Sequence, residues 1–371
     1  MRIAVLGVGL IGGSIGLASR DRLGARVVGY DPDQGILDRA LELGAIDEVA
    51  PSPAEAAAGA DIAFCAAPVR ELPGLVEAAL AAGGDAVVSD VGSTKRELVA
   101  RVAAHPDAER FIGGHPIAGA ESAGVEHARA DLFDGARWYL TPSPTASGVH
   151  YDRLQRAIAE IGADVLRELG ARPQAIDAES HDRLLATVSH LPHVLANALV
   201  GQAVAAASEE AERLPEAGPS FRDATRVAGA NPRIWADIFA SNADVVAAEI
   251  DAVVERLREA AAVIRSGDRD RIYAWQQEAR SARARLMEGA RTAGPLRELR
   301  ASVANRPGTL AELALALGRA GVNIEDMALY PAPDMRTGAV TMWVAGDAEA
   351  ERAADIVRGL GHSVDIVSEG Q

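Results

Sequence analysis

Short apolar runs alternate with amphipathic helical patterns over residues 1–171. The expected strands are Ile3–Leu6, Arg26–Gly29, Ile62–Cys65, Ala86–Ser89, Phe111–Ile112 and Trp138–Leu140. Helical stretches such as Lys95–Ala104 lie between them. This alternation is typical of βαβ units. It predicts an α/β domain built on a parallel sheet.

The pattern changes near Gln174, where long stretches rich in alanine and leucine begin and continue to about Arg291. They carry helical periodicity and almost no strand signal. Proline and glycine within Leu214–Ser220 predict a loop between helices. Residues 172–292 are therefore expected to form an all-helical domain, which Thr292–Pro295 links to the C-terminal residues of the chain.

Strand and helix patterns return over residues 296–371. The expected order is strand, helix, strand, strand, helix, strand, with these bounds: Leu299–Val303, Leu310–Ala320, Val322–Tyr330, Ala339–Val344, Ala348–Gly359 and His362–Val367. A turn at Asn305–Gly308 comes after the first strand. This βαββαβ order predicts a ferredoxin-like α+β module.

Composition and charge narrow the classes of partner. The 371 residues carry a formal net charge of −16, which argues against nucleic acid or an anionic membrane as partner. One cysteine, Cys65, leaves no internal disulfide, and no apolar stretch is read as a membrane span. The apolar run after Arg2 resembles a signal peptide, but glycines suited to phosphate binding interrupt it. A cytoplasmic protein is expected.

A glycine-rich turn joins the first strand to the first helix in Gly7-Val8-Gly9-Leu10-Ile11-Gly12. Gly7 suits a tight turn, Gly9 the close approach of a pyrophosphate, and Gly12 the packing of helix on strand. The helix N-terminus supplies N–H groups and partial positive charge to the phosphates. This context predicts a Rossmann-type dinucleotide site; a turn without ligand is the alternative.

Asp31 ends the next expected strand, where a carboxylate can accept hydrogen bonds from both ribose hydroxyls. It would repel a 2′-phosphate, and Pro32 and Asp33 supply no compensating cation. NAD is therefore expected rather than NADP. The candidate cofactor-binding residues are Gly7, Gly9, Leu10, Ile11, Gly12, Asp31 and Pro68.

Two segments that come after later strands carry candidate catalytic groups. Ser93 lies in Asp90-Val91-Gly92-Ser93-Thr94-Lys95, and a helix N-cap is its alternative role. Lys95 is the only lysine of the chain. His115 lies in Gly113–Gly119, where its neighbouring glycines and proline indicate a loop open to substrate; a surface histidine is the alternative.

The helical domain offers further candidates. Ser189-His190-Leu191-Pro192-His193 places its serine and histidines on one helix face, with Pro192 interrupting the helix. Upstream, His181 stands next to Asp182. Three histidines make zinc conceivable, but no metal motif is present and no metal is expected. Arg222 and Arg226, in Arg-Asp-Ala-Thr-Arg, could bind carboxylates or form a solvated helical face.

Together these motifs resemble the prephenate dehydrogenase family over essentially the whole chain. The specific ones are Gly-Gly-His-Pro-Ile-Ala-Gly at 113–119 and Ser-His-Leu-Pro-His at 189–193. The last 75 or so residues resemble an ACT regulatory domain, marked by Asn305-Arg306-Pro307-Gly308 and Gly321-Val322-Asn323-Ile324. Ala120 replaces a polar residue of some relatives, which puts substrate contacts there in doubt.

The resemblance implies an oxidative decarboxylation of prephenate. Hydride leaves C4 for the nicotinamide while His115 accepts the hydroxyl proton, and carbon dioxide departs as the ring becomes aromatic. Ser93 would bond the same hydroxyl or orient His115. The implied substrate-binding residues are Arg226, His193, Ser189, His190, Arg222 and Glu121. The middle domain would form a homodimer, and no metal is needed.

Three alternatives stay open from the sequence. An arogenate dehydrogenase would share fold and chemistry. A β-hydroxyacid dehydrogenase is expected to use a lysine in its helical domain, and this one has none. A non-catalytic sensor of NAD and amino acids would not need the His115 segment. The C-terminal module is expected to bind tyrosine as an effector through Asn305, Pro307, Gly308 and Asn323; a structural role in dimerisation is the alternative.

Overall fold

The computed structural model describes residues 1–118, 123–162, 172–209, 218–289, 296–304, 308–331 and 337–367. The chain divides into two compact units. The first unit combines Met1–His181 with Ala293–Gln371, and the second is Asp182–Thr292. The C-terminal module therefore belongs to the same unit as the N-terminal domain. The first four residues of the predicted inter-helix loop, 214–217, and the whole predicted linker, 292–295, fall outside the described residues.

The N-terminal domain is an eight-stranded sheet of order β3-β2-β1-β4-β5-β6-β7-β8. Its strands are β1 Arg2–Leu6, β2 Arg26–Tyr30, β3 Glu48–Val49, β4 Ile62–Cys65, β5 Val87–Asp90, β6 Phe111–Pro116, β7 Arg137–Pro142 and β8 Arg172–Ala175. Its helices are α1 Leu10–Leu23, α2 Gln34–Glu42, α3 Pro53–Ala57, α4 Leu72–Ala81, α5 Arg96–Val102 and α6 Gly148–Ile161, with short 3-10 turns at Val69–Glu71, Ala108–Arg110 and Val125–His127. The first six strands have the order of a Rossmann fold.

The sheet departs from the expected all-parallel arrangement at one pair. Strands β1 to β6 pair in parallel, but β7 runs antiparallel to β6 and β8 runs parallel to β7. The apolar run predicts a strand but not its direction, because either direction buries the same side chains. Two short strands, β3 and β8, were not expected, and β8 falls within the range assigned to the helical domain.

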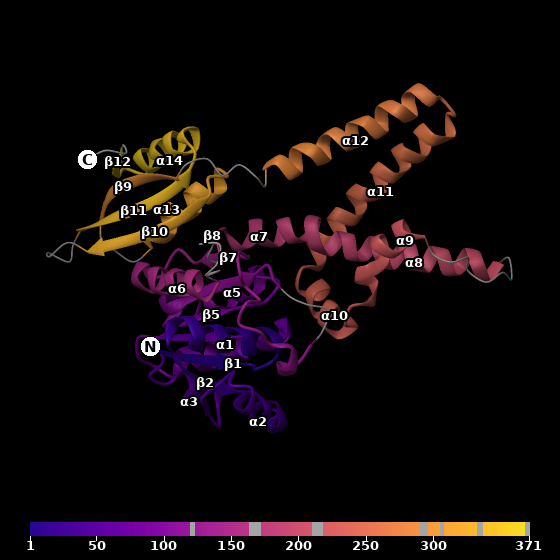
Figure 1. Ribbon diagram of the computed structural model, residues 1–371. Helices are drawn as coiled ribbons and strands as arrows, with labels where there is room; N and C mark the ends of the chain where they lie inside the picture. The colour runs from indigo at the N-terminus through magenta and orange to yellow at the C-terminus, as the bar shows by residue number, and fades with distance from the viewer. Residues whose placement is uncertain are drawn as a thin grey trace. The chain divides into compact units, whose positions relative to one another are not determined.

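The second unit is helical, as its composition predicts. Its elements, with α7 leading into them, are α7 Ala178–Leu185, a π-helical turn η4 Ala186–His190, α8 Leu191–Glu209, α9 Pro219–Thr225, η5 Arg226–Gly229, α10 Pro232–Ser241, α11 Ala243–Arg265 and α12 Arg269–Gly289. Pro192 explains the π turn, because it lacks the N–H that the preceding turn would need. Figure 1 shows α11 and α12 joined by a short turn as a two-helix hairpin whose arms diverge from that turn.

One helix is more apolar than the sequence analysis recognised when it found no candidate membrane span. Among the described residues, the helical segment Ala178–Ala206 is long and apolar enough to cross a membrane by length and composition alone. A core or interface helix of a folded protein meets the same criteria. This helix also buries His181, Asp182, His190 and His193, which a lipid-facing segment would rarely carry. Its composition is therefore weak evidence for a membrane span.

The C-terminal module has the predicted βαββαβ order. Its elements are β9 Leu296–Ala304, α13 Thr309–Arg319, β10 Ile324–Pro331, β11 Thr337–Ala345, α14 Asp347–Gly359 and β12 Ser363–Val367 (Figure 1). The antiparallel sheet has the order β10-β11-β9-β12, which is that of a ferredoxin-like fold. The side chains of this module and of the N-terminal domain join in one hydrophobic cluster.

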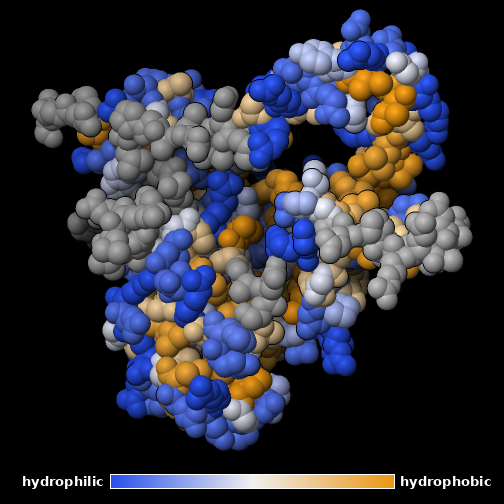
Figure 2. Space-filling view, turned by 45° about the vertical axis from the view of Figure 1, so that its right-hand side comes forward, coloured by the Kyte–Doolittle hydropathy of each residue, from blue (hydrophilic) through white to orange (hydrophobic). Residues whose placement is uncertain are grey.

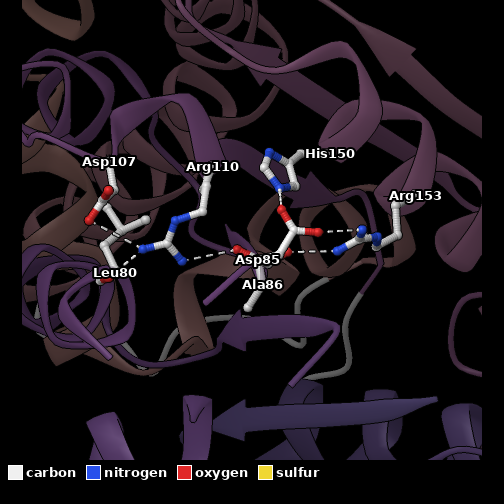
Figure 3. A network of polar contacts seen from close by, with 7 residues as sticks. All are labelled: Leu80, Asp85, Ala86, Asp107, Arg110, His150 and Arg153. Atoms are coloured by element: carbon white, nitrogen blue, oxygen red, sulfur yellow. Dashed lines mark hydrogen bonds and ion pairs between the residues drawn. The ribbon is translucent and has the colours of Figure 1, made fainter. Parts of the chain in front are cut away.

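A polar network fixes α6 to the start of β5 (Figure 3). Asp85 accepts from His150 Nε2 at 2.9 Å and from Arg153 Nη2 at 2.8 Å, while Arg153 Nη1 donates to the Asp85 carbonyl at 2.7 Å. Arg110 donates to the carbonyls of Leu80 and Ala86. The Arg153 guanidinium and the His150 imidazole hold the pKa of Asp85 below its ordinary value. Helix α6 is thus anchored where the C-terminal module packs.

Candidate active site

The glycine-rich turn has the geometry that its sequence predicts. Gly7 has φ +97°, and a Cβ atom there would lie 2.5 Å from the Ala66 carbonyl oxygen, so only glycine fits. A Cβ atom on Gly12 would lie 2.0 Å from the Gly7 carbonyl oxygen, which shows how closely α1 packs on the turn. A Cβ atom on Gly9 would meet no atom within 4 Å. The backbone at Gly9 is therefore open to a ligand.

Asp31 comes directly after β2 and closes the same turn. Its Oδ2 atom accepts from the Val8 N–H at 3.0 Å, and its Oδ1 atom accepts from the Asp33 N–H at 3.0 Å. These bonds fix the carboxylate beside the glycine-rich turn. A dinucleotide lying along the turn would meet this carboxylate at its ribose.

A cavity of about 770 Å³ opens at this edge of the sheet. Its lining includes four of the predicted cofactor residues, Gly7, Gly9, Asp31 and Pro68. Leu10 and Ile11 begin α1 and pack against the core instead. Arg70 and Arg101 also line the cavity, which the sequence did not indicate, and Arg101 Nε donates to Glu77 Oε1 at 2.8 Å. The open glycine and the fixed carboxylate fit a dinucleotide.

His115 does not lie on a loop, as the flanking glycines and proline suggested. It lies within β6, its backbone pairs with Tyr139 on β7, and its side chain is buried. The glycines serve close packing: a Cβ atom on Gly114 would lie 2.5 Å from the Asp90 carbonyl oxygen. His115 nevertheless stands at the C-terminal end of β6. In an open parallel sheet this edge is the ligand-binding edge.

A buried ion pair supports the strand that carries His115. Lys95 Nζ bonds to Asp90 Oδ2, and both side chains are fully buried. Asp90 Oδ1 also accepts from the Gly114 N–H at 3.1 Å, and Oδ2 accepts from the Gly92 N–H at 2.8 Å. The only lysine of the chain is therefore part of the packing behind His115. Ser93, in the loop after β5, is half-buried at the same edge of the sheet.

His181 contacts His115, and the sequence analysis assigned it no role. Its Nε2 atom lies 2.9 Å from His115 Nδ1. In the sequence, His181 was notable only for its neighbour Asp182 and for its place near the start of an expected helix. Neither feature indicates a contact with His115. The structure joins it instead to a histidine 66 residues earlier in the chain.

In the helical unit, the predicted Ser-His-Leu-Pro-His run places both histidines on one side. His193 stacks on Trp235 with ring centroids 3.7 Å apart, and His190 meets the same indole edge-on at 6.1 Å. Asn242 Nδ2 donates to the Asp182 carbonyl at 2.8 Å and lies 3.4 Å from His190 Nδ1. The spacing argument for a shared face is therefore correct for His190 and His193.

Burial sets the charge of His193. Burial lowers the pKa of His193, which favours the neutral imidazole. Its Nδ1 atom is buried and has no hydrogen-bond partner within the described part of the chain. A buried polar atom of this kind calls for a ligand or a water as partner. His193 is thus suited to a hydrogen bond with a substrate rather than to an ion pair.

The remaining candidates of this unit lie nearer the surface. Ser189 is half-buried, and Arg222 in α9 and Arg226 in η5 are exposed. Glu121 lies outside the described residues. Over the described ranges, no group of three or more His, Cys, Asp or Glu side chains is placed to hold a metal ion.

Comparison with known proteins agrees with these features. The family model of the prephenate dehydrogenase nucleotide-binding domain matches residues 15–167, and that of the prephenate dehydrogenase dimerization domain matches residues 177–278. A cyclohexadienyl dehydrogenase of Zymomonas mobilis is 35% identical over 76% of this chain and 95% of its own length. A prephenate dehydrogenase of Bacillus subtilis is 28% identical over 96% of this chain and 95% of its own length.

A solved structure extends the likeness to three dimensions. The prephenate dehydrogenase of Aquifex aeolicus, in complex with hydroxyphenyl propionate and NAD+, superposes with a TM-score of 0.69 at 28% identity. The match covers 77% of this chain and 98% of that chain. Some relatives therefore do without about a quarter of this chain, whereas the Bacillus relative spans nearly all of it. By sequence and by fold, the chain belongs to the prephenate dehydrogenase family.

Proposed function

We propose that the chain is an NAD-dependent prephenate dehydrogenase that converts prephenate to 4-hydroxyphenylpyruvate. The observation that carries this proposal is the position of His115. A buried histidine stands at the ligand-binding edge of a sheet whose first turn is built for a dinucleotide. The matching family models and relatives support the same activity.

The side chains of the N-terminal domain supply proton transfer and orientation. NAD, when bound, accepts the hydride from C4 of the substrate. His115 accepts the proton of the C4 hydroxyl, so that a ketone forms as hydride leaves. The ketone is conjugated through to C1 and takes up the electrons released as carbon dioxide departs. Ser93 bonds the same hydroxyl or orients His115.

The helical domain supplies candidates for substrate recognition. Arg226 offers a guanidinium for bidentate pairing with a carboxylate of prephenate. Neutral His193 offers the unpartnered Nδ1 atom. Ser189, His190, Arg222 and Glu121 complete the proposed set. Two arginines, Arg222 and Arg226, against one carboxylate, Glu121, in this proposed set favour the dicarboxylate prephenate over arogenate, whose amino group would need a carboxylate partner.

The direct test is spectrophotometric. The purified chain with prephenate and NAD should form NADH, measured by absorbance, together with carbon dioxide and 4-hydroxyphenylpyruvate. Higher kcat/KM with arogenate would assign the related reaction instead. No turnover of either compound, with NAD still bound, would favour the non-catalytic sensor.

Asp31 is expected to enforce the use of NAD. The variant Asp31→Ser with Pro32→Arg removes the carboxylate that repels a 2′-phosphate and adds a cation beside it. It should lower the KM for NADP and raise that for NAD, measured from initial rates with each cofactor. Asp33→Ser, two residues on, is the matched control and should keep the NAD preference. An unmodified enzyme that already prefers NADP would contradict this role of Asp31.

A homodimer formed by the helical domain is part of the proposal. Figure 2 shows hydrophobic side chains along the α11–α12 hairpin. The exposed apolar residues of this unit include Leu199, Val204, Leu257, Ile264, Tyr273 and Leu286. Apolar surface of this kind marks an interaction site.

A cytoplasmic location is also part of the proposal. The single cysteine, Cys65, is buried as a free thiol, and a protein without disulfides suits the reducing cytoplasm.

We propose further that the C-terminal module is an ACT domain that binds tyrosine. Gly308 has φ +87° and caps α13 without a side-chain hydrogen bond, and the N–H groups of a helix N-terminus suit an α-carboxylate. The Thr309 hydroxyl beside it is buried without a partner in the described structure. Asn323, half-buried before β10, offers a donor and an acceptor. Asn305 and Pro307, proposed with them, lie outside the described residues.

Tyrosine is expected to inhibit the enzyme through this site. Coupling free energies of about 1–3 kcal/mol would weaken prephenate affinity or turnover by roughly 5- to 150-fold at saturation. Asn323→Ala should remove most of this inhibition and keep the uninhibited rate, whereas Glu351→Ala on the exposed side of α14 should keep both. Deleting the module is a poorer test, because its core is shared with the N-terminal domain. Full tyrosine sensitivity in Asn323→Ala would place tyrosine at the active site.

A further inference from the structure

The His181 ring contacts two side chains that are neighbours on adjacent strands of the sheet. His115 on β6 pairs with Tyr139 on β7. The His181 ring meets His115 edge-on, with centroids 5.1 Å apart, and meets Tyr139 edge-on at 5.6 Å. The side chain of His181 is fully buried. Its position is therefore set by packing as well as by its bond to His115.

The bond between the two imidazoles constrains where the protons lie. One nitrogen must donate and the other must accept, so His115 Nδ1 and His181 Nε2 carry one proton between them. When His115 Nδ1 donates, its Nε2 atom holds the lone pair that a general base needs. His181 Nε2 then also stabilises the imidazolium that forms after proton transfer. This is the role that a second group performs for a catalytic histidine in general.

The helix that carries His181 begins at a single capping residue. Asp177 Oδ1 accepts from the Ser180 N–H at 2.9 Å, and the Asp177 carbonyl accepts from the His181 N–H at 2.9 Å. His181 thus lies within the first turn of the helix. Because the His181 N–H donates to the Asp177 carbonyl, a displacement of Asp177 would also move the His181 imidazole.

The C-terminal module contacts this capping segment through the end of α13. A Cβ atom on Gly318 would lie 2.5 Å from the carbonyl oxygen of Ala175, two residues before the cap. Arg319 Nε lies 3.5 Å from Asp177 Oδ2. Only a residue without a side chain allows α13 to lie this close to the end of β8. The module therefore supports the start of the helix at two adjacent points.

The other end of α13 is fixed to the N-terminal domain as well. The Gly308 N–H donates to the Ala146 carbonyl at 2.9 Å, and the Leu310 side chain packs where a Cβ atom on Gly148 would lie. Gly148 begins α6, the helix that Asp85 anchors to β5. Helix α13 is thus held at both ends. A displacement of α13 at Gly308, in the proposed effector turn, would therefore also move its other end, which contacts Ala175 and Asp177.

We propose that His181 is a positioning residue for His115, and that the C-terminal module, through Gly318 and Arg319, holds the helix segment that carries His181. This inference rests on the proposed function, because it assigns His115 as the base. It gives the module a short physical route to the catalytic group: from α13 to the cap at Asp177, then to His181 and His115.

The first experiment tests His181. His181→Phe keeps a ring in the packing and removes the bond, and should lower kcat about 10-fold or more while the KM for NAD stays unchanged. His181→Gln retains an acceptor and should recover part of the loss. A melting temperature within the error of the unmodified chain separates this effect from unfolding. Normal kcat in His181→Phe would overturn the positioning role.

The second experiment tests the link to the module with two matched glycines. Gly318→Ala adds a methyl group against the Ala175 carbonyl, whereas Gly359→Ala, also at the end of a module helix, adds one where no atom lies within 4 Å. Gly318→Ala should lower kcat several-fold and leave the KM for NAD unchanged; Gly359→Ala should change neither. Equal kcat in the two variants would overturn the link.

A readout without substrate separates this inference from the proposed function. ¹⁵N NMR of the eight histidines reports which ring nitrogen of His115 is protonated. The unmodified chain should show the proton on Nδ1, and His181→Phe and Gly318→Ala should shift this signal, with His115→Asn used for its assignment. An Nε2-protonated His115 in the unmodified chain, or an unshifted signal, would overturn the inference even in an active enzyme. The expected shifts in a chain that does not oxidise prephenate would contradict only the proposed function.

Discussion

Replacing His115 by asparagine is expected to lower kcat by about 10²–10⁴-fold, the usual contribution of a general base. Asparagine can still form hydrogen bonds at this position but cannot accept the hydroxyl proton. Initial rates at saturating prephenate and NAD measure the effect.

NAD binding should survive the substitution, because His115 lies on β6 and the glycine-rich turn comes after β1. Isothermal titration calorimetry with NAD checks this. His127→Asn, an exposed histidine of the same domain, is the matched control and should keep full activity. Near-normal turnover of His115→Asn would remove His115 from the mechanism and leave the buried imidazole as a packing residue.

Replacing Arg226 by alanine is expected to raise the KM for prephenate and leave that for NAD almost unchanged. Truncating one partner of a buried charge pair costs about 2–5 kcal/mol. Arg226 is exposed in the free chain, so the low end, about 2 kcal/mol or roughly 30-fold, is expected. Arg226→Lys should recover only part of the loss, because a lysine cannot form the bidentate pair.

Arg233 provides the control for this experiment. It is an exposed arginine of the same unit at the start of α10, and it is not among the proposed site residues. Arg233→Ala should leave both Michaelis constants unchanged. An unaltered KM for prephenate in Arg226→Ala would place Arg226 outside the site and transfer the carboxylate-binding role to Arg222.

Local patterns were sufficient for most of the N- and C-terminal elements. The apolar run Ile62–Cys65 forms β4 with the predicted bounds, and the βαββαβ order of the last 75 or so residues is correct. Short strands with few apolar residues were not visible, because Glu48–Val49 and Arg172–Ala175 owe their pairing to neighbouring strands. The direction of β7 was also undetermined, since burial alone does not distinguish a parallel from an antiparallel neighbour.

Within the proposed site, the sequence was informative wherever the chemistry depends on adjacent residues. Gly7, Gly9 and Gly12 act within a single turn, so their spacing predicts their geometry. The Ser-His-Leu-Pro-His run acts within one helix, so helical periodicity predicts its shared face. Arg70 and Arg101 were missed in the cofactor cavity, because they reach it from other elements and match no local motif.

By itself, the sequence predicted the order of helices and strands in the C-terminal module, the glycine-rich turn, and His115 as the proposed base. The tertiary structure decided which residues surround that histidine. Gly113 and Gly114 indicated a loop, but Gly113 lets β6 pack against Thr141 and Lys95, Gly114 lets it pack against Asp90, and His115 is buried. The contact with His181 joins residues 66 positions apart. Such a contact depends on where helix and sheet meet in space, which periodicity and turn chemistry do not encode.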